Sequence, residues 1–210
     1  TVIFGQRTIR ISNGIDFSSI PLRQQIHTME NELHLIGVAE IHFWHGFDRI
    51  INGLKEYYTQ NPTYKVYFHI VGNLSGERER QEIEMPIHTY GLSPYVILHG
   101  AKHGKELDVL FEKADFAVGS LARHRSGIQN IKTLKNREYA ARGFGFIYSE
   151  TDDDFEKMPY ILKAPADETP IEISKVIAFC KKQTTPPQEI RDSIRNLSWK
   201  EQMKKVYDSI

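Results

Sequence analysis

Residues 114–149, ADFAVGSLARHRSGIQNIKTLKNREYAARGFGFIYS, decide the fold of this 210-residue chain. The stretch reads as an apolar strand, a long polar loop, a short helix and a second apolar strand. Strand, loop, helix and strand in this order form the unit from which open parallel sheets are built. A loop that leads from a strand into a helix also presents free backbone N–H groups, which favour bound anions.

The loop and the helix of this stretch carry most of the candidate site residues. Arg125, Ser126 and Gly127 lie in the loop, and the helix is expected to begin near Thr133. Lys135 would then lie in the first helical turn, where a cation opposes the helix dipole unless an anion binds there. The pattern therefore predicts an anion site at this strand end.

The rest of the chain repeats the alternation of apolar strands with amphipathic helices of about 10–15 residues. This alternation is typical of a parallel sheet with right-handed crossovers and helices on both faces. We predict a doubly wound, Rossmann-like α/β domain in residues 1–185 and a C-terminal helical extension in residues 186–210 that packs on it. Strands are expected at 8–12, 32–39, 64–71, 95–99, 115–119, 144–148 and 160–163, and helices at 46–60, 77–90, 105–113, 133–142, 171–182 and after 189.

Composition narrows the class of protein. The 27 basic and 27 acidic residues balance, which argues against a nucleic-acid partner. One cysteine, Cys180, excludes an internal disulfide and fits a reducing, cytoplasmic location. No apolar run reaches the roughly 20 residues that span a bilayer, and no signal-peptide pattern is visible. The chain begins without Met, and we expect it to be a fragment of a longer protein.

Small residues follow two further predicted strands, at Gly72 and at Gly100 and Ala101. The carboxyl ends of parallel strands meet at one edge of the sheet, so these loops should lie near the basic loop. Glycine permits close backbone approach or positive φ. The loops therefore predict either parts of one ligand site or ordinary turns between strands and helices.

Ordered motifs across nearly the whole chain resemble a known family. They are ISNGID (11–16), WHGFDRI (44–50), VG (71–72), GLSPYVILHG (91–100), EL to ADFAV (106–118), EYAARG (138–143), and SW to VY (198–207). Each motif is weak alone, but their order and spacing are similar to the C-terminal, donor-binding domain of GT-B glycosyltransferases of the retaining group 1, or family-4-like, kind.

The resemblance implies that this domain holds a nucleoside-diphosphate sugar as donor, with no further cofactor and no metal. A separate N-terminal domain, absent here, would hold a saccharide or lipid-linked acceptor. Glu138 occupies the position of the motif Glu that binds the donor ribose in the family. A carboxylate suits two vicinal hydroxyl donors. The alternative is a surface Glu paired with Arg142 four residues later.

Two departures from the family pattern bear on the diphosphate. The first motif Glu, expected near Asn130, is missing. Glu40 stands where the family has a phosphate-binding Arg, and His45, followed by Gly46, stands where it has a Lys. Three interpretations stay open. Arg125, Lys135 and the helix N-terminus supply the charge, His45 partly replaces the Lys, or the domain has lost catalysis.

Other patterns are weaker. The run of three acidic residues at 152–154 is most simply a solvated turn or helix start. Three lysines near Trp199 could touch an anionic membrane at its inner face, or the helix could dock on its own domain.

From the motif resemblance we predict the donor half of a glycosyltransferase of glycan biosynthesis, whose catalytic residues are unknown. A non-catalytic nucleotide-sugar-binding or scaffold module and a GT-B nucleotide-sugar epimerase are the alternatives.

Overall fold

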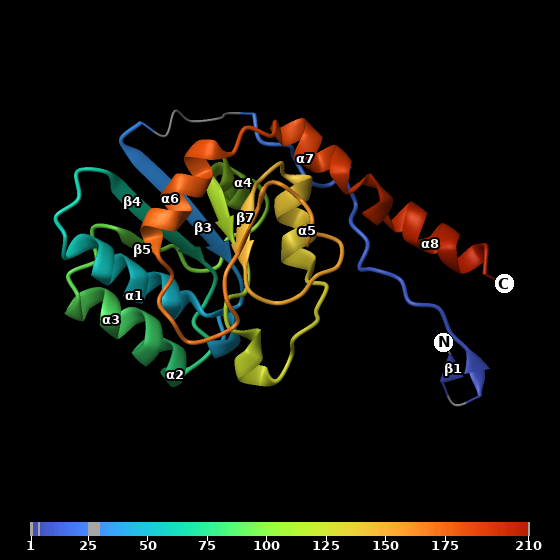
Figure 1. Cartoon of the computed structure of the whole chain (residues 1–210), viewed down its shortest axis with the longest axis horizontal. Helices are drawn as coiled ribbons and strands as arrows, with labels where there is room; N and C mark the ends of the chain where they lie inside the picture. Colours follow the sequence, from blue (N-terminus) through green and yellow to red (C-terminus); the bar gives the residue numbers. More distant parts are fainter. Residues whose placement is uncertain (1, 4, 25–29, 210) are drawn as a thin grey trace.

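The computed structural model describes residues 2–3, 5–24 and 30–209, and a six-stranded parallel sheet lies at its centre (Figure 1). The strand that enters the sheet first lies in the middle, and the chain builds outward from it to both edges. This is the Rossmann strand order, so the predicted fold class is confirmed. In spatial order the strands are β5 (Val96–Leu98), β4 (Lys65–Val71), β3 (Glu32–Val38), β6 (Phe116–Val118), β7 (Phe146–Tyr148) and β8 (Ile161–Lys163).

Helices cover both faces of the sheet, which explains why its strands are nearly continuous apolar runs. On one face, Leu35 and Phe68 pack in a core with α1 (Phe47–Tyr58), α3 (Met85–Thr89) and α6 (Ile173–Lys182). On the other, Ile36 and Phe146 pack with α4 (Gly104–Glu112), α5 (Leu134–Ala141) and α7 (Pro187–Ser193). Burying both faces removes apolar area from water, which is the main stabilising contribution to this fold.

The helix predicted at 77–90 is present as three consecutive pieces. They are α2 (Glu77–Glu79), a π-helical turn (Arg80–Glu84) and α3. Gly91 follows with φ +66°, a left-handed conformation that stops the helix at little steric cost. The boundary signal in the sequence was therefore correct.

The strand predicted at residues 8–12 is wrong. The N-terminal strands are β1 (Val2–Ile3) and β2 (Gln6–Arg7), a small antiparallel pair outside the main sheet. The following segment bonds to the C-terminal helices instead of a strand, because the Ser12 N–H donates to the Gln202 side chain and the Trp199 N–H to the Ile15 carbonyl. A Cβ at Gly14 would lie 2.4 Å from the Trp199 ring, so the close contact requires glycine there.

The chain ends in α8 (Trp199–Tyr207), which follows a 3₁₀ turn (Arg195–Leu197) and extends away from the sheet beside the N-terminal segment (Figure 1). Its Gln202 is buried, whereas Trp199, Met203 and Tyr207 are exposed. Within the described ranges, each helix is too short or too polar to span a bilayer. The boundary at residue 185 and a contact of α8 with a membrane stay predictions.

Tyr139 of α5 joins the two central strands where they diverge. β3 and β6 pair only at Leu35–Phe116 and Ile36–Ala117. Beyond these pairs, the Tyr139 hydroxyl accepts the Val38 N–H at 3.0 Å and donates to the Val118 carbonyl at 3.1 Å. The side chain is 1 % exposed. One hydroxyl thus satisfies a partly buried donor and a buried acceptor at the carboxyl edge of the sheet.

Replacing Tyr139 by Phe should destabilise the domain, because it leaves the Val38 N–H and the Val118 carbonyl without partners. A buried unsatisfied polar group costs about 1–3 kcal/mol. For a chain of this size each kcal/mol lowers the melting temperature by about 2–4 °C. Urea unfolding and calorimetry would measure both quantities.

Tyr160→Phe is the matched control. The Tyr160 side chain is equally buried, but its hydroxyl bonds to Ser193 Oγ, which also donates to the Ile190 carbonyl. Removing the Tyr160 hydroxyl therefore leaves no backbone group without a hydrogen-bond partner. Equal losses of stability in the two variants would contradict the bridging role of Tyr139.

Candidate functional site

The loops after β3 and β6 hold each other at the carboxyl edge of the sheet. The Leu121 N–H donates to the His45 carbonyl at 2.9 Å. Gly46, the residue before α1, has φ +66°, and a Cβ there would lie 2.8 Å from the Ala122 Cβ. The close approach of these two loops therefore requires glycine at position 46. The loops meet between β3 and β6, where the strand order reverses, and we call this place the switch point.

His45 lies in the 3₁₀ turn Phe43–His45 and is 5 % exposed. Its Nδ1 accepts the His42 N–H at 3.0 Å, which leaves the ring hydrogen on Nε2. Burial and the nearby charges of Lys135 and Arg123 lower the pKa of His45 to about 2. At neutral pH His45 is therefore uncharged, and it can offer a phosphate one hydrogen bond but no positive charge.

Several side chains near this edge carry a buried polar atom without a hydrogen-bond partner in the described part of the chain, and three of them, His124, Asn136 and Arg137, are hydrogen-bonded through their other polar atoms. We refer to Ser120, Arg123, Lys135 and Glu150 as the buried polar cluster. The atoms concerned are Ser120 Oγ, Arg123 Nε, Lys135 Nζ and both carboxylate oxygens of Glu150. Ser120 follows β6 and Glu150 follows β7, while Arg123 lies in the 3₁₀ turn Arg123–Ser126. Unpaired buried groups are rare in native proteins and call for a physical explanation.

Burial sets the charges of the cluster. It lowers the pKa of Lys135 to about 7, an effect that the Glu150 charge opposes and the Arg123 charge reinforces. Burial also raises the pKa of Glu150 to about 7, against the attraction of Lys135, Arg123 and Lys163. Both groups therefore titrate near pH 7. An anion bound beside Lys135 would favour the protonated form of the lysine.

The predicted loop residues have structural partners. The Arg125 guanidinium forms a two-point ion pair with Asp48 at 2.9 and 2.7 Å, bonds to Glu168 and donates to the Phe43 carbonyl at 2.8 Å. Ser126 Oγ donates to the Arg123 carbonyl at 2.9 Å, and Gly127 ends the turn with φ +70°. A role for Arg125, Ser126 and Gly127 in binding an anion stays a prediction, and it would require Arg125 to exchange partners.

Glu138 lies in the middle of α5 and pairs with Arg142, whose Nε donates to Glu138 Oε1 at 2.9 Å. Arg142 also donates to Asp108 of α4 at 2.7 Å. The pair four residues apart, expected as the alternative, is thus present. Since the Glu138 side chain is 32 % exposed, it keeps acceptor capacity, and ribose binding stays a prediction.

The glycine loops after β4 and β5 meet each other. The Gly72 N–H donates to the Gly100 carbonyl at 2.8 Å, and the Ala101 N–H to Asn73 Oδ1 at 3.3 Å. A Cβ at Gly72 would lie 1.6 Å from the Ala39 carbonyl oxygen, so glycine is required there by backbone packing. This geometry explains Gly72 without a ligand, and contacts of Gly100 and Ala101 with a donor stay predictions.

Two features of the loop after β7 were missed or misread in the sequence. Glu150 was not singled out, although its place directly after a strand is the signal that selected the other loops. Asp152 was expected in a solvated turn, which is wrong: it is fully buried and forms a two-point ion pair with Arg137 at 2.6 and 3.1 Å. Arg137 is itself fully buried on the inner side of α5, so its charge draws Asp152 inward.

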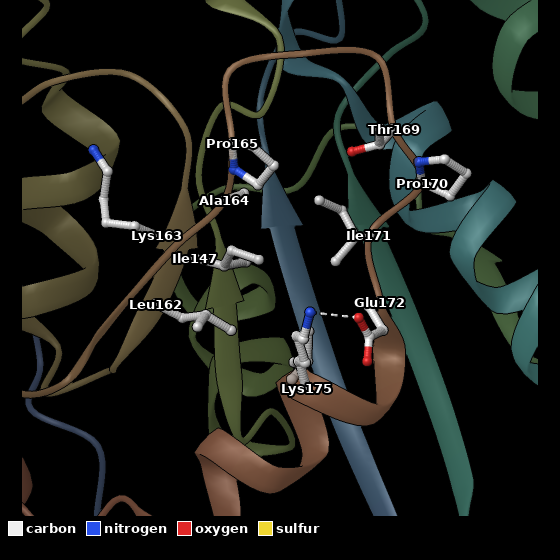
Figure 2. A pocket seen from close by; sticks show the side chains of 11 residues that line it. Ile147, Leu162, Lys163, Ala164, Pro165, Thr169, Pro170, Ile171, Glu172 and Lys175 are labelled. Atoms are coloured by element: carbon white, nitrogen blue, oxygen red, sulfur yellow. Dashed lines mark ion pairs between the residues drawn. The ribbon is translucent and has the colours of Figure 1, made fainter.

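A separate cavity of about 160 Å³ lies between β7, β8 and the start of α6. Figure 2 shows Ile147, Leu162 and Ile171 around it, with the exposed ion pair of Lys175 and Glu172 at 2.6 Å on its rim. Its lining is mainly apolar and contains none of the four cluster residues. The cavity is therefore separate from the buried polar cluster. Across the described ranges, no group of three or more His, Cys, Asp or Glu is arranged to hold a metal ion.

Comparison with known proteins supports the fold. No protein-family model matches the chain, and neither does any curated protein. Solved structures do match: HepE from Anabaena in complex with UDP and glucose (TM-score 0.67, 16 % identity, 95 % of this chain) and sucrose-phosphate synthase from Thermosynechococcus elongatus (0.68, 18 %, 95 %). The chain spans about half the length of these two proteins, 55 % and 51 %.

A third match is to a single domain. The C-terminal domain of LpcC, a group 1 glycosyl transferase family protein from Francisella tularensis, is covered over 96 % of its length by 86 % of this chain (TM-score 0.57, 16 % identity). The chain therefore has the fold of one domain of group 1 GT-B glycosyltransferases, as the motifs predicted. At these identities the likeness concerns the fold.

The buried cluster should leave a dip in the pH dependence of stability near pH 7. Because the pKa of Glu150 is raised from 4.5 to about 7, the free energy of unfolding should fall between about pH 4.5 and 7. Because the pKa of Lys135 is lowered from 10.5 to about 7, it should rise again between about pH 7 and 10.5. Urea unfolding of wild type and of Lys135→Met/Glu150→Gln tests this, and the double variant should lack both slopes.

The exposed pair Lys175→Met/Glu172→Gln serves as control, since it also removes one cation and one anion. Its profile should follow that of the wild type. If the double variant at the cluster kept the wild-type profile, Lys135 and Glu150 would titrate normally in the folded protein.

Proposed function

We propose that this domain binds a nucleoside-diphosphate sugar between the carboxyl ends of β3 and β6 and serves as the donor-binding half of a glycosyltransferase. The observation that carries the proposal is the buried polar cluster at the switch point, where Lys135 and Arg123 keep unpaired donors. Open parallel sheets bind their ligands at this point. The likeness to HepE, crystallised with UDP-glucose, supports the same ligand class.

The diphosphate would bind where α5 begins. The first N–H groups of a helix have no acceptor within the helix, and the helix dipole favours negative charge there. Thr133 caps the Asn136 N–H, which leaves the earlier N–H groups available to a ligand. Lys135 adds a cation that becomes more fully charged as the anion arrives. Arg123, whose guanidinium lies 5.5 Å from the Trp44 ring centre, is the second candidate cation.

Sugar transfer would follow from stabilising the leaving diphosphate. Preorganised N–H groups and cations at a site of developing negative charge are a large contribution to catalysis. We propose no protein nucleophile from this domain, and the acceptor, saccharide or lipid-linked, would be held by a second domain outside this chain. The retaining stereochemistry rests on the motif resemblance. The buried, unbridged Cys180 supports the proposed cytoplasmic location.

One observation favours a second candidate function, a nucleotide-sugar-binding module without catalysis. Glu40 is exposed at the end of β3, where the resemblance leads us to expect a phosphate-binding Arg, and Arg125 is engaged by two carboxylates. Such a module would still bind nucleotide but would show no transfer in the full-length protein. Product analysis of the full-length protein with UDP-, GDP- and ADP-sugars separates the two functions and also identifies an epimerase.

Lys135→Met should weaken binding of nucleoside diphosphates and leave nucleoside binding unchanged. A hydrogen bond to a charged group contributes about 1.5–3 kcal/mol, which is roughly 10- to 150-fold in Kd. Calorimetric titration of uridine, guanosine and adenosine and of their diphosphates measures both classes of ligand on each variant.

Lys200→Met, on the exposed side of α8, is the matched control and should bind every ligand as the wild type does. Absence of any binding to the wild type at millimolar concentration would refute the proposed donor site. Equal losses for nucleoside and diphosphate in Lys135→Met would place the diphosphate elsewhere, with His45 the next residue to replace.

Glu138→Gln should abolish discrimination between ribose and 2′-deoxyribose. If the carboxylate accepts the ribose hydroxyls, the wild type should prefer the ribonucleoside diphosphate over its 2′-deoxy form by about tenfold or more. The variant should bind both forms with the same, weaker affinity. Stability should change little, since Gln keeps an acceptor for the Arg142 Nε and Arg142 keeps its ion pair with Asp108. Unchanged discrimination would leave Glu138 as a structural partner of Arg142.

A further inference from the structure

Glu150 presents a rigidly placed carboxylate whose two oxygens have no partner among the described residues. The side chain is 2 % exposed. The backbone on both sides is fixed to the loop after β6: the Ser149 N–H donates to the Ser120 carbonyl at 3.0 Å, and the Thr151 N–H to the Gln129 carbonyl at 2.7 Å. Lys163 Nζ donates to the Glu150 carbonyl, not to its carboxylate. The backbone of Glu150 is thus held in place while its carboxylate accepts no hydrogen bond from the described residues.

The chemistry of an ionised carboxylate restricts what can satisfy it. It accepts hydrogen bonds and donates none, so a phosphate, which is also an anionic acceptor, would be repelled. The potential donors of the cluster, Lys135 Nζ, Ser120 Oγ and Arg123 Nε, do not bond to it. A ligand that completes the cluster must therefore bring negative charge to the cations and hydroxyl donors to Glu150. A glycosyl diphosphate has both kinds of group on adjacent atoms.

We propose that Glu150 accepts hydroxyl groups of the donor's sugar and so makes the site select a nucleotide sugar over the bare nucleoside diphosphate. This inference rests on the proposed function and adds the residue that reads the glycosyl part. Two vicinal hydroxyls match the two oxygens of one carboxylate. The raised pKa of Glu150 supports this, because hydroxyl donors would favour the charged form that burial disfavours.

The test compares two ligands on the same protein, using the base that the wild type binds from three probe pairs: UDP and UDP-glucose, GDP and GDP-mannose, ADP and ADP-glucose. Calorimetric titration of Glu150→Gln should show sugar-nucleotide affinity reduced by about 10- to 150-fold. Affinity for the nucleoside diphosphate should be unchanged or higher, because the variant removes a negative charge near the phosphates. Asp153→Asn, an exposed acid in the same loop, should leave both affinities at the wild-type values.

If a variant is less stable, partial unfolding lowers the apparent affinity for both ligands by the same factor. The ratio of the two affinities is therefore unaffected by a loss of stability. Glu150→Asp is the second variant: it keeps the charge but withdraws the carboxylate by one methylene, so it should lose sugar-nucleotide affinity without gaining diphosphate affinity. A wild-type ratio in both variants overturns the role of Glu150 and leaves the nucleotide site intact. A wild type that binds neither member of any pair overturns the proposed function and this inference with it.

Discussion

The geometry of the candidate site depends on the hydroxyl of Tyr139, which bridges β3 and β6 where the two strands separate. The two central strands pair at only two positions and then separate, and a single phenol satisfies the Val38 N–H and the Val118 carbonyl that separation would otherwise leave unpaired. Without it, those strand ends would need water or direct pairing, and direct pairing would bring the loops together. Tyr139 of α5 therefore keeps the ends of β3 and β6 apart while satisfying their backbone groups.

The loops around the opening between β3 and β6 are fixed by buried arginines that bond to carbonyls and carboxylates of the protein itself. Arg49 of α1, 1 % exposed, donates to the carbonyls of Leu121, Pro165 and Thr169 and so ties the loops after β6 and β8 to one helix. Arg137 serves the loop after β7 through Asp152. Fixed loops matter because a site that stabilises charge works best when its donors are already in place.

The sequence predicted the sheet well because its strands are buried on both faces, and burial leaves a continuous apolar signature. It failed at residues 8–12, where an extended segment pairs with helices after residue 194, since nothing local distinguishes that partner from a strand. At the site, the loops were found from their place after strands and the helix start from Thr133, whose side chain does cap α5. The partners of Arg125 and the burial of Asp152 depend on residues far away in the chain, so no spacing rule could supply them.

Ser120, Arg123, Lys135 and Glu150 bring several unpaired polar atoms to one edge of the sheet. Arg49 and Arg125 show that this chain can surround a buried or half-buried guanidinium with carbonyls and carboxylates. Lys135 and Glu150 are close enough to shift each other's pKa, yet they form no hydrogen bond. A scaffold selected for stability alone would gain by closing this pair or by replacing it with apolar residues. Local departures of this kind are expected where function opposes stability. Because a bound ligand that supplied the missing partners would also relieve the cost of burial, binding and folding stability should be coupled at these residues.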